Sequence, residues 1–143
     1  MILSSHHHNY KLNEMNQDTY EAVKTACSWL GIAIQDTADQ VGWEKTLELR
    51  EKKGTINGEQ AVSFFKSHDP KTRLKEFGVI TETWHNKSGW DLEVKATETE
   101  LTSIIHTCPM FDGYLESGLS VEQANNICKA LHRGARAREI QRS

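Results

Sequence analysis

The chain has 143 residues, which is enough for one domain with a single hydrophobic core. Hydrophobic residues make up 37% and charged residues 26%, a globular composition that excludes a disordered or disulfide-dense chain. There are 17 Lys and Arg against 20 Asp and Glu, so the net charge is −3, and no apolar run approaches the roughly 20 residues of a membrane span. We therefore expect no nucleic acid and no membrane among the partners.

The cysteine content and the first residues indicate a reducing, cytoplasmic setting. Three cysteines in a chain of this length do not make a disulfide framework. The opening residues combine neither a basic segment nor a long apolar one, so no secretory signal is predicted. Residues 1–15, which include the histidine run His6 to His8, are predicted to be a flexible N-terminal tail. Residues 16–143 are predicted to form a single α+β domain.

The first half of the domain is predicted to be helical. From Tyr20 to Val41, apolar residues recur every three or four positions, as on the buried face of an amphipathic helix. A second helix is expected to stop at Gly54, after basic residues that suit the negative end of the helix dipole. A third is expected to begin near Asn57 and to end before Pro70. A short helix over residues 71–78 follows.

The pattern then changes to that of a three-stranded antiparallel meander. Residues 79–85 are rich in β-branched and aromatic side chains, and residues 90–96 alternate apolar with charged ones. Residues 101–107 give a third strand. Two C-terminal helices complete the α+β fold, and the second begins at a capping box formed by Ser120 and Gln123.

Cys108 is the strongest candidate for a reactive group. The segment from His106 to Pro109 lies where a strand is expected to end and a helix to begin. The amides at a helix N-terminus stabilise a thiolate, and proline suits the first helical position. His106 would act as a base or form an ion pair with the sulfur. The alternative is that Cys108 is a small buried residue that closes the joint.

Three further residues are candidates for binding a substrate. Cys128 lies on the apolar stripe of the last helix and would face Cys108 if that helix folds back. Asp112 and Glu116 are four residues apart, on one helical face, where they could orient a base or hold a substrate ammonium group. The alternatives are a core cysteine and a solvated helix face.

The order of these elements resembles the L-2-amino-thiazoline-4-carboxylic acid hydrolase-like family, which is loosely related to four-vinyl-reductase-type ligand-binding domains. The likeness covers residues 20–135, and its sharp features are Cys108-Pro109 and Cys128. It implies hydrolytic opening of a small cyclic cysteine derivative to a carbamoyl-cysteine. The chain is shorter than is typical of that family, and a dimer would supply the missing wall of a pocket.

Three functions follow from these features. The leading hypothesis is a cysteine-dependent C–N hydrolase, without metal or cofactor, that acts on a small polar, sulfur-containing cyclic amidine or carboxylate. The second is a non-catalytic module that binds a small ligand, or an accessory subunit of a larger enzyme complex or homo-oligomer. The third is a metal or redox sensor that uses Cys108, Cys128 and a histidine.

Overall fold

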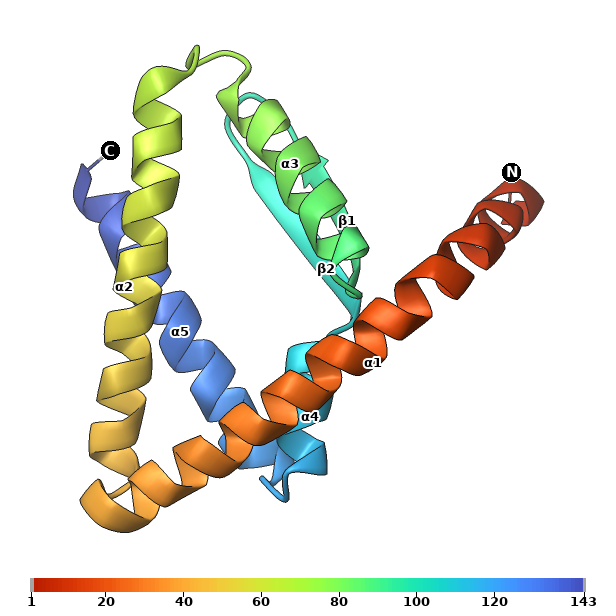
Figure 1. Ribbon diagram of the computed structural model, residues 1–143. Coiled ribbons are helices and arrows are strands. Elements are labelled where there is room, and N and C mark those ends of the chain that lie inside the picture. The colour runs from red at the N-terminus through yellow and green to blue at the C-terminus, as the bar shows by residue number, and fades with distance from the viewer. Residues whose placement is uncertain (1, 143) are drawn as a thin grey trace.

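The computed structural model describes the backbone of residues 2–142 and the side chains of residues 17–135 (Figure 1). Its elements are α1 (Ile2–Val41), α2 (Trp43–Ser67), α3 (Arg73–Lys87), β1 (Asp91–Ala96), β2 (Leu101–Thr107), α4 (Pro109–Glu116) and α5 (Val121–Arg142). The side chains of the tail expected over residues 1–15 lie outside the described residues, and the tail stays a prediction.

The elements form an open triangle (Figure 1). Helices α1 and α2 meet at a sharp corner at Gly42, and α5 runs beside α2 along one side. Helix α3 and the two strands make a second side, which contacts the end of α2 where the Phe77 ring lies 5.0 Å from the Phe65 ring. Helix α4 lies on α1 and links the strands to α5.

Helix α2 does not stop at Gly54, because that glycine makes a close helix contact. A Cβ atom at Gly54 would collide with the backbone carbonyl oxygen of Leu131 in α5. One at Gly58 would lie 2.6 Å from the carbonyl oxygen of Ala135, and one at Gly134 would collide with α2 in return. The paired positions advance together, so the two helices run parallel. We call Gly54, Gly58 and Gly134 the glycine contact.

The prediction of a three-stranded meander is wrong, because residues 79–85 belong to α3. The sheet has two antiparallel strands within the described residues, β1 and β2, with Leu92 opposite Ile105 and Val94 opposite Ser103. Helix α3 passes through Gly78, where the short helix was expected to end. Contacts with the sheet override the local β-preference of this segment.

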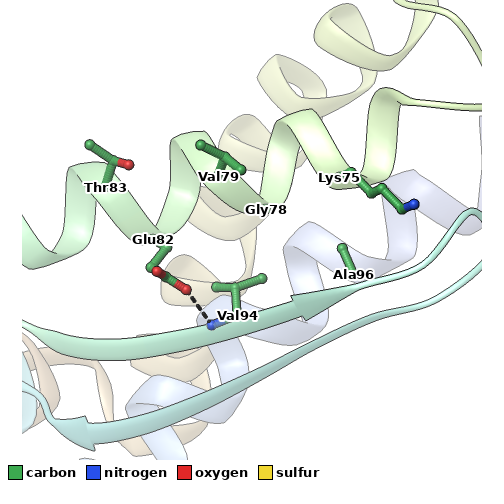
Figure 2. A pocket seen from close by; sticks show the side chains of 7 residues that line it. All are labelled: Lys75, Gly78, Val79, Glu82, Thr83, Val94 and Ala96. Atoms are coloured by element: carbon green, nitrogen blue, oxygen red, sulfur yellow. Dashed lines mark hydrogen bonds between the residues drawn. The ribbon is translucent and has the colours of Figure 1, made fainter. Parts of the chain in front are cut away.

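Two side chains of α3 bind the backbone edge of β1. The Asn86 amide accepts a hydrogen bond from the Leu92 N–H at 2.9 Å and donates one to the Leu92 carbonyl at 3.2 Å. The Glu82 carboxylate accepts from the Val94 N–H at 2.7 Å (Figure 2). One helical turn, about 5.4 Å, nearly matches two strand residues, about 6.8 Å, so side chains four apart serve alternate strand residues. Side chains of α3 therefore make hydrogen bonds to β1 that a neighbouring strand would otherwise make.

Other predicted elements are confirmed. Strands β1 and β2 lie within one residue of the predicted second and third strands. The capping box before α5 is present, since Gln123 N–H donates to the Ser120 hydroxyl at 3.1 Å and Ser120 N–H donates to the Gln123 side chain at 3.0 Å. Pro109 begins α4.

The hydrophobic core lies where α1, α4 and α5 meet. Its buried residues are Ile34, Tyr114, Leu119, Ala124 and Ile127. This core is small for the length of the chain, and it lies next to the predicted reactive cysteine at the start of α4.

We expect Gly54→Ala to lower the free energy of unfolding by about 2 kcal/mol or more, because the added methyl group meets backbone that cannot rotate away. Asn57→Ala, at an exposed position of the same helix, is the matched control and should change stability little. Urea denaturation of the two variants measures the difference. Equal stability would show that α2 and α5 are not in close contact.

Candidate cysteine site

Cys108 is the N-cap residue of α4. Its backbone is extended, and its Sγ accepts a hydrogen bond from the Phe111 N–H at 3.4 Å. Pro109 follows at the first helical position and is buried. The sulfur thus lies at the positive end of a helix dipole with a backbone donor directed at it, an arrangement that stabilises negative charge on sulfur.

The other two cysteines lie close enough to Cys108 to interact with it electrostatically. Cys27 of α1 and Cys128 of α5 both pack against the core. Burial raises the pKa of Cys27, and it raises the pKa of Cys128 to about 11. A negative charge on Cys108 raises both values further. We call the three residues the cysteine cluster. All three are free thiols.

Sequence analysis missed two residues at this cluster, Arg50 and Tyr114. Tyr114 is fully buried, and its hydroxyl has no hydrogen-bond partner among the described residues. The buried Nε of Arg50 also lacks one there. Burial raises the pKa of Tyr114 to about 12, while the charge of Arg50 lowers the pKa values of Tyr114 and Cys128. The guanidinium therefore lies near both groups.

The position of Arg50 follows from the glycine contact. Arg50 precedes Gly54 by four residues, so it lies one turn earlier on the face of α2 that packs on α5. In sequence it is one of many charged residues in an amphipathic helix, and nothing local distinguishes it. Tyr114 is equally inconspicuous in its short helix. Only the packing of α2, α4 and α5 brings the two together.

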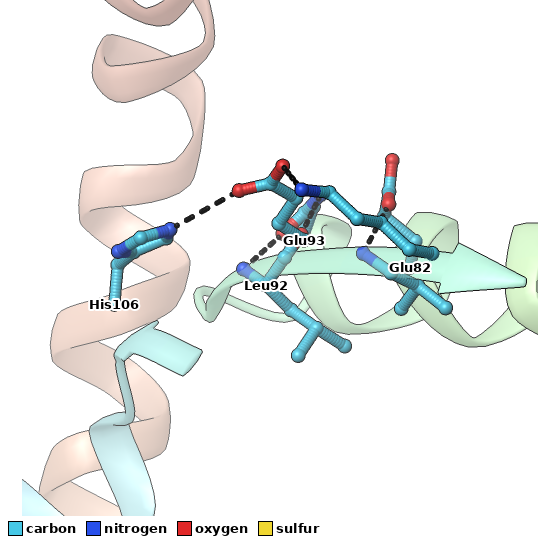
Figure 3. A network of polar contacts seen from close by, with 7 residues as sticks. Glu82, Leu92, Glu93 and His106 are labelled. Carbon is cyan, nitrogen blue, oxygen red and sulfur yellow. Dashed lines mark hydrogen bonds and ion pairs between the residues drawn. The ribbon is translucent and has the colours of Figure 1, made fainter. Parts of the chain in front are cut away.

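His106 lies on the solvent-exposed face of the sheet. Its Nε2 is 3.5 Å from a carboxylate oxygen of Glu93 on the neighbouring strand, and both side chains are about half exposed (Figure 3). The contact that the structure gives this imidazole is therefore a polar contact with Glu93 across the strands. Its role as a base for Cys108 stays a prediction.

Asp112 and Glu116 face α1. The Tyr20 hydroxyl donates a hydrogen bond of 2.6 Å to Asp112, which together with burial raises the pKa of Tyr20 to about 12. The Lys24 ammonium is 3.9 Å from Glu116. These contacts hold α4 against α1, so the two carboxylates have a structural use. Their role in binding a substrate stays a prediction.

Three surface pockets lie on other parts of the structure. The first is a groove of about 250 Å³ between α3 and β1, with Glu82 at its centre (Figure 2). The second, of about 650 Å³, lies between α2 and α5 and is flanked by Glu48 and Arg133. The third, of about 470 Å³, lies on the outer face of α3 near His68. The residues that line them do not include the cysteine cluster, Arg50 or Tyr114.

Across the part of the chain that the structure describes, no group of three His, Cys, Asp or Glu side chains is arranged to hold a metal ion. The helices within the described residues are all too short or too polar to cross a bilayer. Comparison with protein-family models, curated proteins and solved structures finds no match for this chain.

Stability should fall between pH 9 and about 11 because the folded Cys128 holds its proton above its ordinary pKa of 9.0. The unfolded chain loses that proton first, so rising pH favours unfolding. Cys128→Ala should lack the part of this pH dependence that comes from the thiol. The difference in unfolding free energy between the natural chain and this variant should therefore shrink by about 1–2 kcal/mol over that range. Urea denaturation at a series of pH values measures it. Parallel pH profiles would show that Cys128 is not buried as a neutral thiol.

Proposed function

We propose that the chain is a hydrolase-like protein that acts on a small cyclic amidine carrying a carboxylate, with Cys108 as the nucleophile. The observation that carries this proposal is the pair of buried polar groups near the cysteine cluster, the Arg50 Nε and the Tyr114 hydroxyl, which have no hydrogen-bond partner among the described residues. A nucleophile beside groups that can stabilise or bind an anion is the usual composition of an active site.

The contrast between the cysteines supports Cys108 as the reactive group. Cys27 and Cys128 have raised pKa values, so at neutral pH they are protonated and unreactive. Cys108 receives a backbone hydrogen bond at its sulfur and lies at a helix N-terminus. We therefore assign the role of nucleophile to Cys108 and none in the chemistry to the other two thiols.

The proposed reaction is a hydrolysis in two stages. The Cys108 thiolate adds to the amidine carbon, the ring C–N bond breaks, and the departing nitrogen takes up a proton. Water then adds to the same carbon and gives up a proton, which replaces the one that the nitrogen took up. The bond between the carbon and the Cys108 sulfur breaks, and the thiolate is restored. The net reaction consumes one water molecule and opens the ring. His106 is proposed to carry protons between these stages.

The guanidinium of Arg50 and the hydroxyl of Tyr114 would hold the substrate carboxylate. Arginine binds carboxylates through two parallel hydrogen bonds, and a buried hydroxyl without a partner gains most from a new acceptor. The same assignment fits the resemblance to the L-2-amino-thiazoline-4-carboxylic acid hydrolase-like family, which rests on Cys108, Pro109 and Cys128.

Cys108 should be alkylated by iodoacetamide at neutral pH much faster than Cys27 and Cys128, because burial keeps those two thiols protonated. Peptide mass spectrometry after short exposure measures the rate at each residue. Cys108→Ala should abolish turnover of a cyclic amidine while the circular dichroism spectrum is unchanged. Equal, slow labelling of all three cysteines, or turnover by the alanine variant, would contradict the proposal.

A negatively charged reagent tests the carboxylate subsite without a known substrate. We expect Arg50→Met to lower the ratio of the iodoacetate rate to the iodoacetamide rate at Cys108 by about tenfold, the loss of one charge-assisted hydrogen bond. Arg133→Met, which removes an exposed arginine that pairs with Glu51, is the matched control and should leave the ratio unchanged. An equal fall of this ratio in both variants would indicate only a general charge effect.

Tyr114→Phe separates binding from packing. The substitution removes a hydroxyl that has no partner in the described structure, so the variant should be at least as stable as the natural chain. We expect the ratio of the iodoacetate rate to the iodoacetamide rate at Cys108 to fall in this variant as well. A destabilised variant with an unchanged ratio would show that the hydroxyl has a structural partner and no role in binding.

A second candidate function is that of a non-catalytic accessory subunit. Large apolar side chains stay more than half exposed on two different helices, including Trp29 of α1 and Trp84 of α3. Exposed aromatic residues are typical of interfaces. Cysteines that resist alkylation in the folded protein would favour this function over the first.

A further inference from the structure

The two edges of the sheet differ in whether their backbone groups have hydrogen-bond partners. The outer edge of β1 is covered by α3, whose Asn86 and Glu82 side chains bind the backbone of Leu92 and Val94. Strand β2 has β1 on one side, and no described side chain makes a hydrogen bond to its other edge. One edge is therefore closed and the other is open.

The register identifies the backbone groups at the open edge. Leu92 and Val94 direct their N–H groups to α3, so they cannot also bind β2. In an antiparallel pair the hydrogen-bonded and non-bonded positions alternate, and the residue opposite a non-bonded one also points outward. Leu92 and Val94 lie opposite Ile105 and Ser103. The N–H and C=O groups of Ser103 and Ile105 are therefore the unpaired ones.

Strand β2 lacks the features that protect an edge. Its seven residues, Leu101–Thr107, contain no proline, lysine, aspartate or glutamate. The five residues from 102 to 106 are exposed on both faces, and the side chains of Ile104 and Ile105 are 41% and 50% exposed. Exposed edge strands normally carry charges or prolines that prevent pairing with another chain. An edge without them favours pairing.

We propose that β2 pairs antiparallel with β2 of a second copy of this chain, forming a continuous four-stranded sheet. A two-fold axis at Ile104 would place Ser103 opposite Ile105 of the partner subunit, which pairs every outward group of both residues. A second copy fits because the strand is self-complementary in this register. Thr102 would face His106 of the partner subunit, so no two residues of like fixed charge are opposed.

The side chain of Ile104 supports this register. It lies on the face of the sheet opposite α3, since its strand partner is Glu93 and the neighbouring Leu92 faces inward and is buried. On the two-fold axis it would contact the Ile104 of the partner subunit at a Cβ separation of about 5 Å. The pair would cover apolar surface that is exposed in a single chain.

Sedimentation equilibrium across a concentration series tests the proposal. We expect the natural chain to form dimers and Ile104→Lys to weaken the dimer at least tenfold, because two ammonium groups would oppose each other on the axis. Val79→Lys, the same kind of change at an exposed position of α3, is the matched control and should leave the dimer intact. Circular dichroism shows whether each variant is folded.

Hydrogen exchange gives a second readout that needs no variant. The amide protons of Ser103 and Ile105 should be protected at high protein concentration and exchange quickly at low concentration, while those of Thr102 and Ile104 stay protected throughout. A chain that is monomeric at every concentration overturns the proposal. So does a dimer in which the Ser103 and Ile105 amides exchange quickly, because the second copy then binds another surface.

Discussion

The rest of this structure depends on the close contact between the backbones of α2 and α5. Gly54 and Gly58 on one helix and Gly134 on the other leave no room for a side chain between the two. Because the helices lie so close, the position of α5 along α2 is fixed, and its first half is directed onto α4 and α1. The core around Tyr114 forms there. Arg50 lies on the same face one turn before Gly54, so the contact that fixes the helices also buries part of a cation.

The three cysteines near this core have different surroundings. Two of the thiols, Cys27 and Cys128, are partly buried, which favours their neutral form. The third, Cys108, takes the place that serine or aspartate usually fills at the start of a helix, and it accepts a backbone hydrogen bond as they do. The fold thus distinguishes chemically identical groups by the donors and the solvent around each. A fully buried phenol and a guanidinium without partners in the described region add two donors to the same place.

Local signals in the sequence predicted some elements and failed at others for physical reasons. The capping box at Ser120 is a contact between residues three apart, and it was predictable for that reason. Residues 79–85 contain strand-forming side chains, but Val79 and Ile80 point to solvent, and the helix is selected by contacts of Gly78, Glu82 and Asn86 with the sheet. Gly54 was expected to end a helix because a local pattern cannot reveal a partner helix more than 70 residues away. Cys108 was identified from its neighbours alone, whereas Arg50 and Tyr114 needed the packing.

The glycine contact also sets the order in which the chain can fold. Its two sides are about 80 residues apart, so during synthesis α2 leaves the ribosome long before its partner exists. Helix α3 and the two strands pair with each other over short separations and can form in the meantime. Until α5 is complete, the narrow glycine face of α2 stays open to water, and Arg50 stays hydrated. The last helix to be made therefore closes the triangle and removes water from the cysteine cluster in the same step.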